Sequence, residues 1–230
     1  MLVVLSGEGK SDLGYKADNG DFIKGPMVHA IEYFFLKEGQ HPQYHYISEK
    51  ELTKIRKDNR RAYLGIRGAT EKPYKGIYNL AVHLSSYARK KFKEKHSVVL
   101  FRDADGTNSV PHDAWDKKVN AVLAGFNSVN KANGVPMIPR PKSEAWLLAY
   151  YQKNLPNQHA YNKPERFEDY SGNDASKNSL KKLLQQAFKG EENPYSQIDG
   201  QEIDWERIDM LSFNRFKKRL KEVIKYLLQP

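Results

Sequence analysis

The 230-residue chain has 39% hydrophobic and 12% aromatic residues, a composition that supports a folded core and argues against a disordered protein. It contains no cysteine, which excludes disulfides and thiolate zinc sites, and it has no apolar run near the roughly 18 residues needed to cross a bilayer. A net charge of +10 favours a polyanionic partner, nucleic acid rather than a membrane. No basic residues precede the apolar run at residues 1–5, so we expect a cytoplasmic protein without a secretory signal.

Short β-prone runs alternate with helical periodicity along the first 150 residues. We expect strands at residues 2–5, 44–47, 97–101 and 135–138. Helices are expected at residues 26–37, 77–95 and 113–126, and another begins at Ser143. The polar, glycine-containing residues 18–25 predict a loop. This alternation predicts an α/β fold with a mostly parallel central sheet of about four strands flanked by helices.

The composition changes beyond Leu155, where Asn, Gln, Lys and Pro dominate to Asn178 without a strand signal. Two helices are expected after this stretch, at residues 179–188 and 212–228. We therefore divide the chain into an α/β domain, residues 1–155, and a helical C-terminal extension, residues 156–230, packed on it.

Two carboxylates end the third expected strand, where an apolar run stops at Asp103 and Asp105 and Gly106 follows. Ligands of open α/β sheets bind beyond the carboxyl ends of the strands. Carboxylates spaced in this way make a hard-oxygen site of the kind that Mg²⁺ or Mn²⁺ prefers. The structural alternative is an Asp-x-Asp-Gly turn that closes the strand.

Two further acids are expected near the same edge of the sheet. Glu8 follows the first strand with a glycine on each side, and Glu144 stands in the first turn of a helix capped by Ser143. A phosphate-binding P-loop is excluded because Val4 stands where that motif requires glycine. The alternative for Glu144 is a favourable interaction with the helix dipole. Parallel strands end at one edge, so we expect these acids to meet the aspartate pair.

Residues 49–76 are the most basic stretch of the chain, and tyrosines are interleaved with its cations. This pattern indicates a nucleic-acid contact surface, while the alternative is a solvated helix followed by a loop. The candidate nucleic-acid-binding residues in this stretch are Lys54, Arg56, Lys57, Arg60, Arg61 and Arg67. Lys10, which follows Glu8 closely, is a further candidate.

A glutamate after strand one and an Asp-x-Asp after a later strand resemble the motifs of the Toprim domain, which topoisomerases, DnaG-type primases, ribonuclease maturases and OLD-family nucleases share. Residues 6–9 (Ser-Gly-Glu-Gly) are similar to its Glu motif, and residues 101–106 (Phe-Arg-Asp-Ala-Asp-Gly) to its Asp-x-Asp motif. The resemblance covers about residues 1–150 and implies a Toprim-like sheet.

A second likeness lies in residues 138–149, which resemble the "iPv-x-x-x-EaWLLAD" signature of an uncharacterised bacterial Toprim-like family related to OLD-type nucleases. Lys177 or Lys181, and the pair at residues 212–213 (Ser-Phe), match later features of that family. Tyr150 stands where the signature has Asp, which argues against an acid at that position.

The resemblance implies hydrolysis of phosphodiester bonds in DNA or RNA with Mg²⁺ or Mn²⁺. It makes Asp103 and Asp105 metal ligands and Glu8 a ligand or the general acid/base. Glu144 would be a ligand of a second ion, and Lys142 or Lys10 would contact the scissile phosphate.

The net charge makes nucleic acid the first expected partner. An ATPase protein is expected because some members of the family that this chain resembles lie beside ATPase genes, and a second copy of the chain is a further expected partner. Such a nuclease would act in bacterial defence against phage or in DNA repair. The alternative function is a subunit that binds nucleic acid or docks onto an ATPase without cutting.

Overall fold

A computed structural model describes residues 1–58, 72–104, 112–157, 163–171, 173–176 and 179–229. Its central sheet has the strand order β4-β1-β5-β6, and all neighbouring strands are parallel. The strands are β1 (Leu2–Gly7), β4 (Gln43–Tyr46), β5 (His96–Phe101) and β6 (Gly134–Met137). The predicted α/β class, with a parallel sheet of four strands flanked by helices, is confirmed.

The two central strands are apolar on both faces because helices cover both. All six residues of β5 are buried, and so are the last five of β1, as expected for parallel strands between two helical layers. Gly7 ends β1 at a point of close backbone contact. A Cβ atom at Gly7 would lie 2.3 Å from the carbonyl oxygen of Phe101, so no larger residue fits without moving β5.

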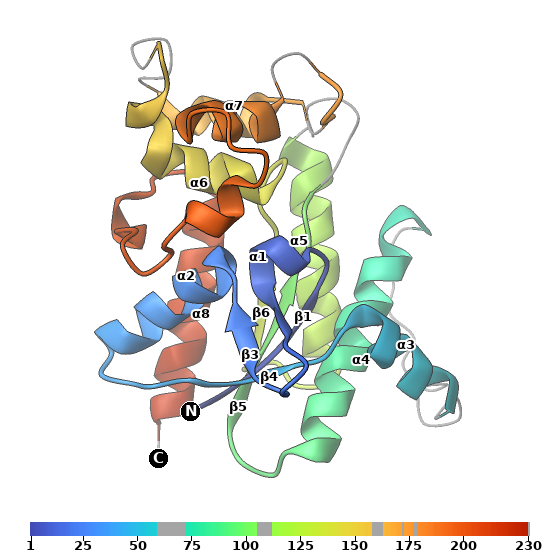
Figure 1. Ribbon diagram of the computed structural model, residues 1–230. Helices are drawn as coiled ribbons and strands as arrows, with labels where there is room; N and C mark the ends of the chain where they lie inside the picture. Colours follow the sequence, from blue (N-terminus) through green and yellow to red (C-terminus); the bar gives the residue numbers. More distant parts are fainter. Residues whose placement is uncertain (59–71, 105–111, 158–162, 172, 177–178, 230) are drawn as a thin grey trace.

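Two hydrophobic clusters fill the space on either side of the sheet. One face packs against α2 (Pro26–Lys37) and α8 (Leu211–Leu228), drawn in blue and red in Figure 1. The other packs against α4 (Lys75–Lys91) and α5 (His112–Asn127), and α3 (Glu49–Asp58) lies beside α4. Helices α6 (Ser143–Tyr151) and α7 (Leu180–Ala187) lie beyond the carboxyl edge of the sheet (Figure 1). No helix in the described ranges is both long and apolar enough to span a membrane.

The segment between β1 and α2 differs from the prediction. A short helix, α1 (Lys10–Leu13), leads into an antiparallel pair of strands, β2 (Gly14–Lys16) and β3 (Phe22–Lys24). The prediction of a loop at 18–25 is therefore wrong for residues 22–24. Phe22 stacks on Tyr46 with a centroid distance of 5.6 Å, a contact with the edge strand β4 that local sequence does not reveal.

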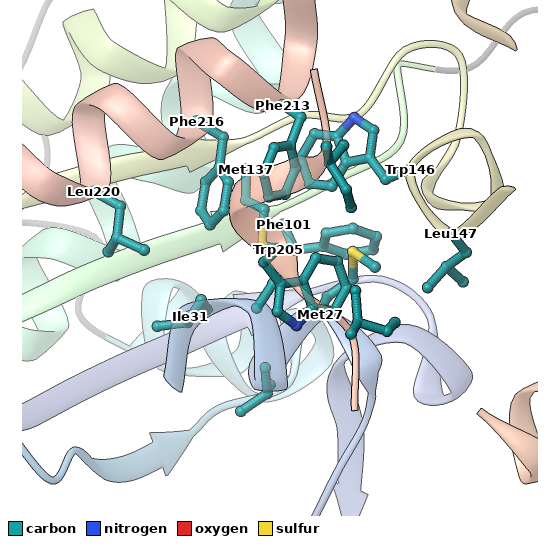
Figure 2. Close-up of a cluster of buried hydrophobic side chains, with 14 of the residues drawn as sticks. Met27, Ile31, Phe101, Met137, Trp146, Leu147, Trp205, Phe213, Phe216 and Leu220 are labelled. Carbon is teal, nitrogen blue, oxygen red and sulfur yellow. The ribbon is translucent and has the colours of Figure 1, made fainter. Parts of the chain in front are cut away.

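The C-terminal segment shares its core with the sheet. Its helix α8 follows three short 3-10 helices, η5 (Pro164–Asp169), η6 (Pro194–Gln197) and η7 (Trp205–Arg207). Two more 3-10 helices, η2 (Lys72–Tyr74) and η3 (Gln152–Asn154), flank α4 and α6. Figure 2 shows aromatic side chains from α6, η7 and α8 packed together with residues of β5, β6 and α2. Residues on both sides of position 155 thus form one continuous core.

A buried hydrogen-bond chain runs through this core. The indole Nε1 of Trp146 donates to Ser212 Oγ at 2.7 Å, and Ser212 N donates to Glu168 Oε1 at 2.7 Å. Trp146 also stacks on Phe216 at 5.6 Å and meets Phe213 edge-on at 5.0 Å. The polar atoms of this region are thereby satisfied inside an apolar environment.

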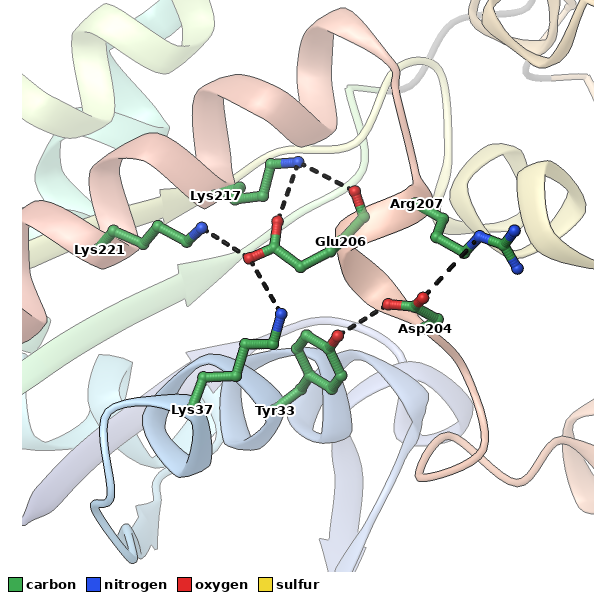
Figure 3. Close-up of polar contacts among 7 residues, drawn as sticks. All are labelled: Tyr33, Lys37, Asp204, Glu206, Arg207, Lys217 and Lys221. Carbon is green, nitrogen blue, oxygen red and sulfur yellow. Dashed lines mark hydrogen bonds and ion pairs between the residues drawn. The ribbon is translucent and has the colours of Figure 1, made fainter.

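A network of ion pairs joins α2 and α8 across η7 (Figure 3). Lysines of both helices surround the carboxylate of Glu206: Lys37 at 3.6 Å, Lys217 at 3.6 Å and Lys221 at 2.7 Å. Burial opposes the ionisation of Glu206, but hydrogen bonding and attraction from Lys221 outweigh it, so the pKa of Glu206 lies below its usual value. Beside it, the Tyr33 hydroxyl donates to Asp204 Oδ1 at 2.7 Å.

Candidate acidic site at the carboxyl edge of the sheet

The structure brings Glu8 and Asp103 into contact. They follow neighbouring parallel strands, β1 and β5, so both emerge at the same edge of the sheet. The backbone N–H of Asp103 donates to Glu8 Oε1 at 3.1 Å. This is the convergence that the sequence pattern predicts for these two acids.

Arg102 holds the Glu8 carboxylate from the other side. Its Nε and Nη2 both donate to the same oxygen, Glu8 Oε2, at 3.2 and 3.1 Å. Together with the Asp103 N–H on Oε1, they hold both oxygens of the carboxylate. Its Nη2 also lies 3.7 Å from Glu49 Oε2, at the start of α3. Burial raises the pKa of Glu49, and attraction to Arg102 opposes that rise. Arg102 was not among the sequence-predicted site residues, although Arg102 directly precedes Asp103 in the Asp-x-Asp motif.

Asp103 is fixed by its backbone and by its side chain. Its Oδ1 accepts the backbone N–H of Ser143 at 3.0 Å, so Asp103 caps the N-terminus of α6 from a distant part of the chain. Lys118 of α5 donates to the carbonyl oxygens of Asp103 and Ala104 at 2.6 and 2.8 Å. These bonds set the direction in which the chain leaves β5.

A second pair of acids lies beside the first. The hydroxyl of Ser143 donates to the carboxylate of Asp12, which α1 carries toward α6. Glu144 is 7% exposed, and its Oε2 has no hydrogen-bond partner among the described residues. Burial raises the pKa of Glu144, and repulsion from Asp12 adds to the effect. Burial also raises the pKa of Asp12, against hydrogen bonds from Ser143 and Ser11.

Tyr195 of η6 completes this second group. Burial raises its pKa well above the usual value, and repulsion from Glu144 and Asp12 raises it further. Neither Tyr195 nor Asp12 was among the sequence-predicted site residues. The place of Asp12 four residues after Glu8 was a usable signal, because one helical turn returns the chain to the same edge. No local pattern points to Tyr195, which is more than 180 residues from Glu8 in the sequence.

The predicted lysines lie near the acids in different ways. Lys142 donates to Asp174 Oδ1 at 3.0 Å. Burial alone would lower the pKa of Lys142, but the hydrogen bond and attraction from Asp174 raise it, and Glu144 and Asp103 add to that attraction. Lys10 is exposed at the start of α1.

Other predicted residues fall wholly or partly outside the described structure. Asp105, Arg60, Arg61, Arg67 and Lys177 lie outside the described residues. Arg56 and Lys57 belong to α3, but the description does not extend to their side chains. Lys54 is on the exposed face of α3, and Lys181 is exposed on α7.

The donor chemistry of this site suits a hard divalent cation, but the described side chains do not form a complete set of ligands. Carboxylate oxygens are the ligands that Mg²⁺ and Mn²⁺ prefer, and the unpartnered Oε2 of Glu144 is an available acceptor. Within the described ranges, no group of three or more His, Asp or Glu side chains could hold a metal ion. The Glu8 carboxylate instead accepts the backbone N–H of Asp103, and Asp12 lies close enough to Glu144 to repel its charge.

Comparison with known proteins gives no relative from which a role could be transferred: no family model matches the chain, and neither curated proteins nor solved structures give a significant match. The function must therefore be inferred from the chemistry of these residues.

Proposed function

We propose that this protein is a Mg²⁺- or Mn²⁺-dependent nuclease of Toprim type, which hydrolyses phosphodiester bonds in DNA or RNA. The observation that carries the proposal is the contact between Glu8 and Asp103 at the carboxyl ends of neighbouring parallel strands. This position is where open α/β sheets bind their ligands.

Asp103 and Glu8, together with Asp105, are the residues that would hold the first cation, and Glu144 belongs to a second position. The chemistry that a bound divalent ion supplies is neutralisation of phosphate charge and activation of water. The chain itself orients the acids. Arg102 fixes the Glu8 carboxylate, and the N-terminus of α6 fixes the side chain of Asp103.

Lys142 is the cation that we assign to the scissile phosphate, because it directly precedes α6 and is therefore next to Ser143 and Glu144. In this structure its ammonium pairs with Asp174. The flanking nucleic acid would be held by salt-sensitive backbone contacts, for which the net charge of +10 and the basic stretch from Lys54 onward are suited. We also propose that the protein is cytoplasmic, has an ATPase partner, and acts in defence against phage or in DNA repair.

One observation favours a second candidate function, a subunit that binds nucleic acid or docks onto an ATPase without cutting. Both oxygens of Glu8 already accept hydrogen bonds, from Arg102 and from the backbone of Asp103. An acid held in this way is a less available ligand than a free one, so cleavage must be measured directly.

The test is nicking of a supercoiled plasmid with Mg²⁺ or Mn²⁺, beside a filter-retention assay for DNA. We expect Glu8→Gln and Asp103→Asn each to reduce nicking by about a hundredfold or more while DNA retention persists. Glu38→Gln, at an exposed carboxylate after α2, is the matched control and should cut normally. Normal cutting by both site variants would refute the assignment. Retention without cutting under all metal conditions would establish the non-cleaving alternative.

A further inference from the structure

A pocket of about 380 Å³ lies away from the acidic site, beside the edge strand β4. Its walls come from β2, β4, α3 and α4. Its polar lining consists mainly of Lys16, His45, Glu51, Lys54, Tyr87 and Lys91. The volume is sufficient for a phosphate with an attached sugar.

Three of the lining residues, His45, Tyr87 and Lys91, form a hydrogen-bonded group. His45 Nε2 and the Tyr87 hydroxyl are 2.8 Å apart, and their rings stack with centroids 5.8 Å apart. Lys91 Nζ donates to the Tyr87 hydroxyl at 3.0 Å and lies 3.4 Å from His45 Nε2. Neither partner of Lys91 is a carboxylate, so they position its ammonium without neutralising its charge.

The pocket carries an excess of positive charge. Lys16, Lys54 and Lys91 form no ion pair with a carboxylate in the described part of the chain. The one lining carboxylate, Glu51, accepts the backbone N–H and hydroxyl of Ser48 at 2.9 and 2.7 Å, as a cap of α3.

His45 responds to this excess charge. Burial lowers the pKa of His45, repulsion from Lys91 and Lys16 lowers it further, and Glu51 opposes the change. These effects favour the neutral imidazole, and an anion in the pocket would favour its protonated form.

We propose that this pocket binds a phosphate group, held by the ammonium groups of Lys16, Lys54 and Lys91 and by the Tyr87 hydroxyl. Three ammonium groups against one carboxylate, Glu51, leave the cavity with a net positive charge, which is the complement of a multiply charged oxyanion. A phosphate satisfies them with more oxygen acceptors than a carboxylate ligand has.

The pocket is also joined to the acidic site through α3. Glu49, in the first turn of α3, lies 3.7 Å from Arg102, which pairs with Glu8. Glu51 and Lys54 follow on the same helix and line the pocket. Because α3 connects the two regions, we take the phosphate source to be a nucleic-acid strand bound at the acidic site, and this assignment rests on the proposed function. A free nucleotide offers the same chemistry.

The experiment follows the ring resonances of His45 by NMR in the absence of divalent metal, with His45→Gln used for assignment. Inorganic phosphate, ADP and a short single-stranded DNA are titrated in separate samples. We expect any of these ligands that binds in the pocket to raise the pKa of His45 and to shift the ring resonances of His45. The Lys16→Met/Lys91→Met double variant should bind roughly tenfold more weakly or worse. Lys225→Met removes an exposed cation from α8 and should bind like the unaltered protein.

The outcomes separate the ligand sources and the two proposals. Tighter binding of the oligonucleotide than of ADP would identify a nucleic-acid backbone, and the reverse would identify a mononucleotide. No response of His45 to any of the three ligands, or equal weakening by Lys225→Met, would overturn the phosphate site. Because the titration needs neither metal nor cleavage, loss of the nuclease proposal would leave this result intact.

Discussion

Ser212→Ala tests whether the buried hydrogen-bond chain beneath α6 stabilises the fold. Trp146 is 0% exposed and Ser212 is 2% exposed, so removal of the hydroxyl leaves the indole N–H without water or another acceptor in the described core. A buried donor without an acceptor lowers the free energy of unfolding by roughly 1–3 kcal/mol, and we expect a loss of about 2 kcal/mol here. For a chain of this size the loss corresponds to a decrease of roughly 4–8 °C in Tm.

The assay is urea unfolding at constant pH, followed by tryptophan fluorescence, with a double-mutant cycle. In a Trp146→Phe background the donor is absent, so Ser212→Ala should cost less than about 0.5 kcal/mol. Ser196→Ala removes an exposed hydroxyl that donates to Asn193 O at 2.8 Å, and it serves as the control with a small effect. Equal costs of Ser212→Ala in both backgrounds would show that the hydrogen bond is not the source of stability.

Three further changes test the packing and the buried charges. Burial raises the pKa of Glu144 above 4.5, so the folded state is favoured while Glu144 is protonated and loses stability as pH rises and the buried carboxyl ionises. Glu144→Gln should therefore stabilise the protein by roughly 1 kcal/mol at neutral pH and have little effect at low pH. Thermal melts at several pH values measure this difference. The pKa of Glu206 is lowered below 4.5, so Glu206→Gln should cost about 1 kcal/mol at neutral pH, and this cost should shrink as pH falls below 4.5. Gly7→Ala places a Cβ 2.3 Å from Phe101 O and should cost about 3 kcal/mol in urea unfolding, whereas a loss below roughly 1 kcal/mol would contradict the close approach of β1 and β5.

The parts of the fold that follow from local chemistry could be predicted from the sequence. The helix at residues 26–37 begins and ends where predicted, because a proline opens it and a glycine follows it closely. The four sheet strands lie within one or two residues of their predicted bounds because their apolar runs are interrupted by polar or turn residues. Their common direction then explains the meeting of Glu8 and Asp103.

The features that the sequence did not predict depend on contacts between distant segments. The β2–β3 pair is short and polar, and its contact with β4 runs through Phe22 and Tyr46. Tyr195 reaches the acids through an irregular segment whose path is set by the packing of η6 rather than by periodicity. The role of Arg102 depends on Glu8, which is 94 residues away in the sequence.

The two-sided burial of β1 has a consequence for synthesis on the ribosome. The face of the sheet toward α4 and α5 can be covered once residues up to Asn127 have left the exit tunnel. The opposite face needs α8, which begins at Leu211 and supplies Phe213 and Phe216 to the core around Trp146. During the intervening 80 or so residues of translation, α6 and α7 join α2 in this cluster, but the apolar surface that α8 covers stays exposed. The protein therefore completes this half of its core only late in synthesis.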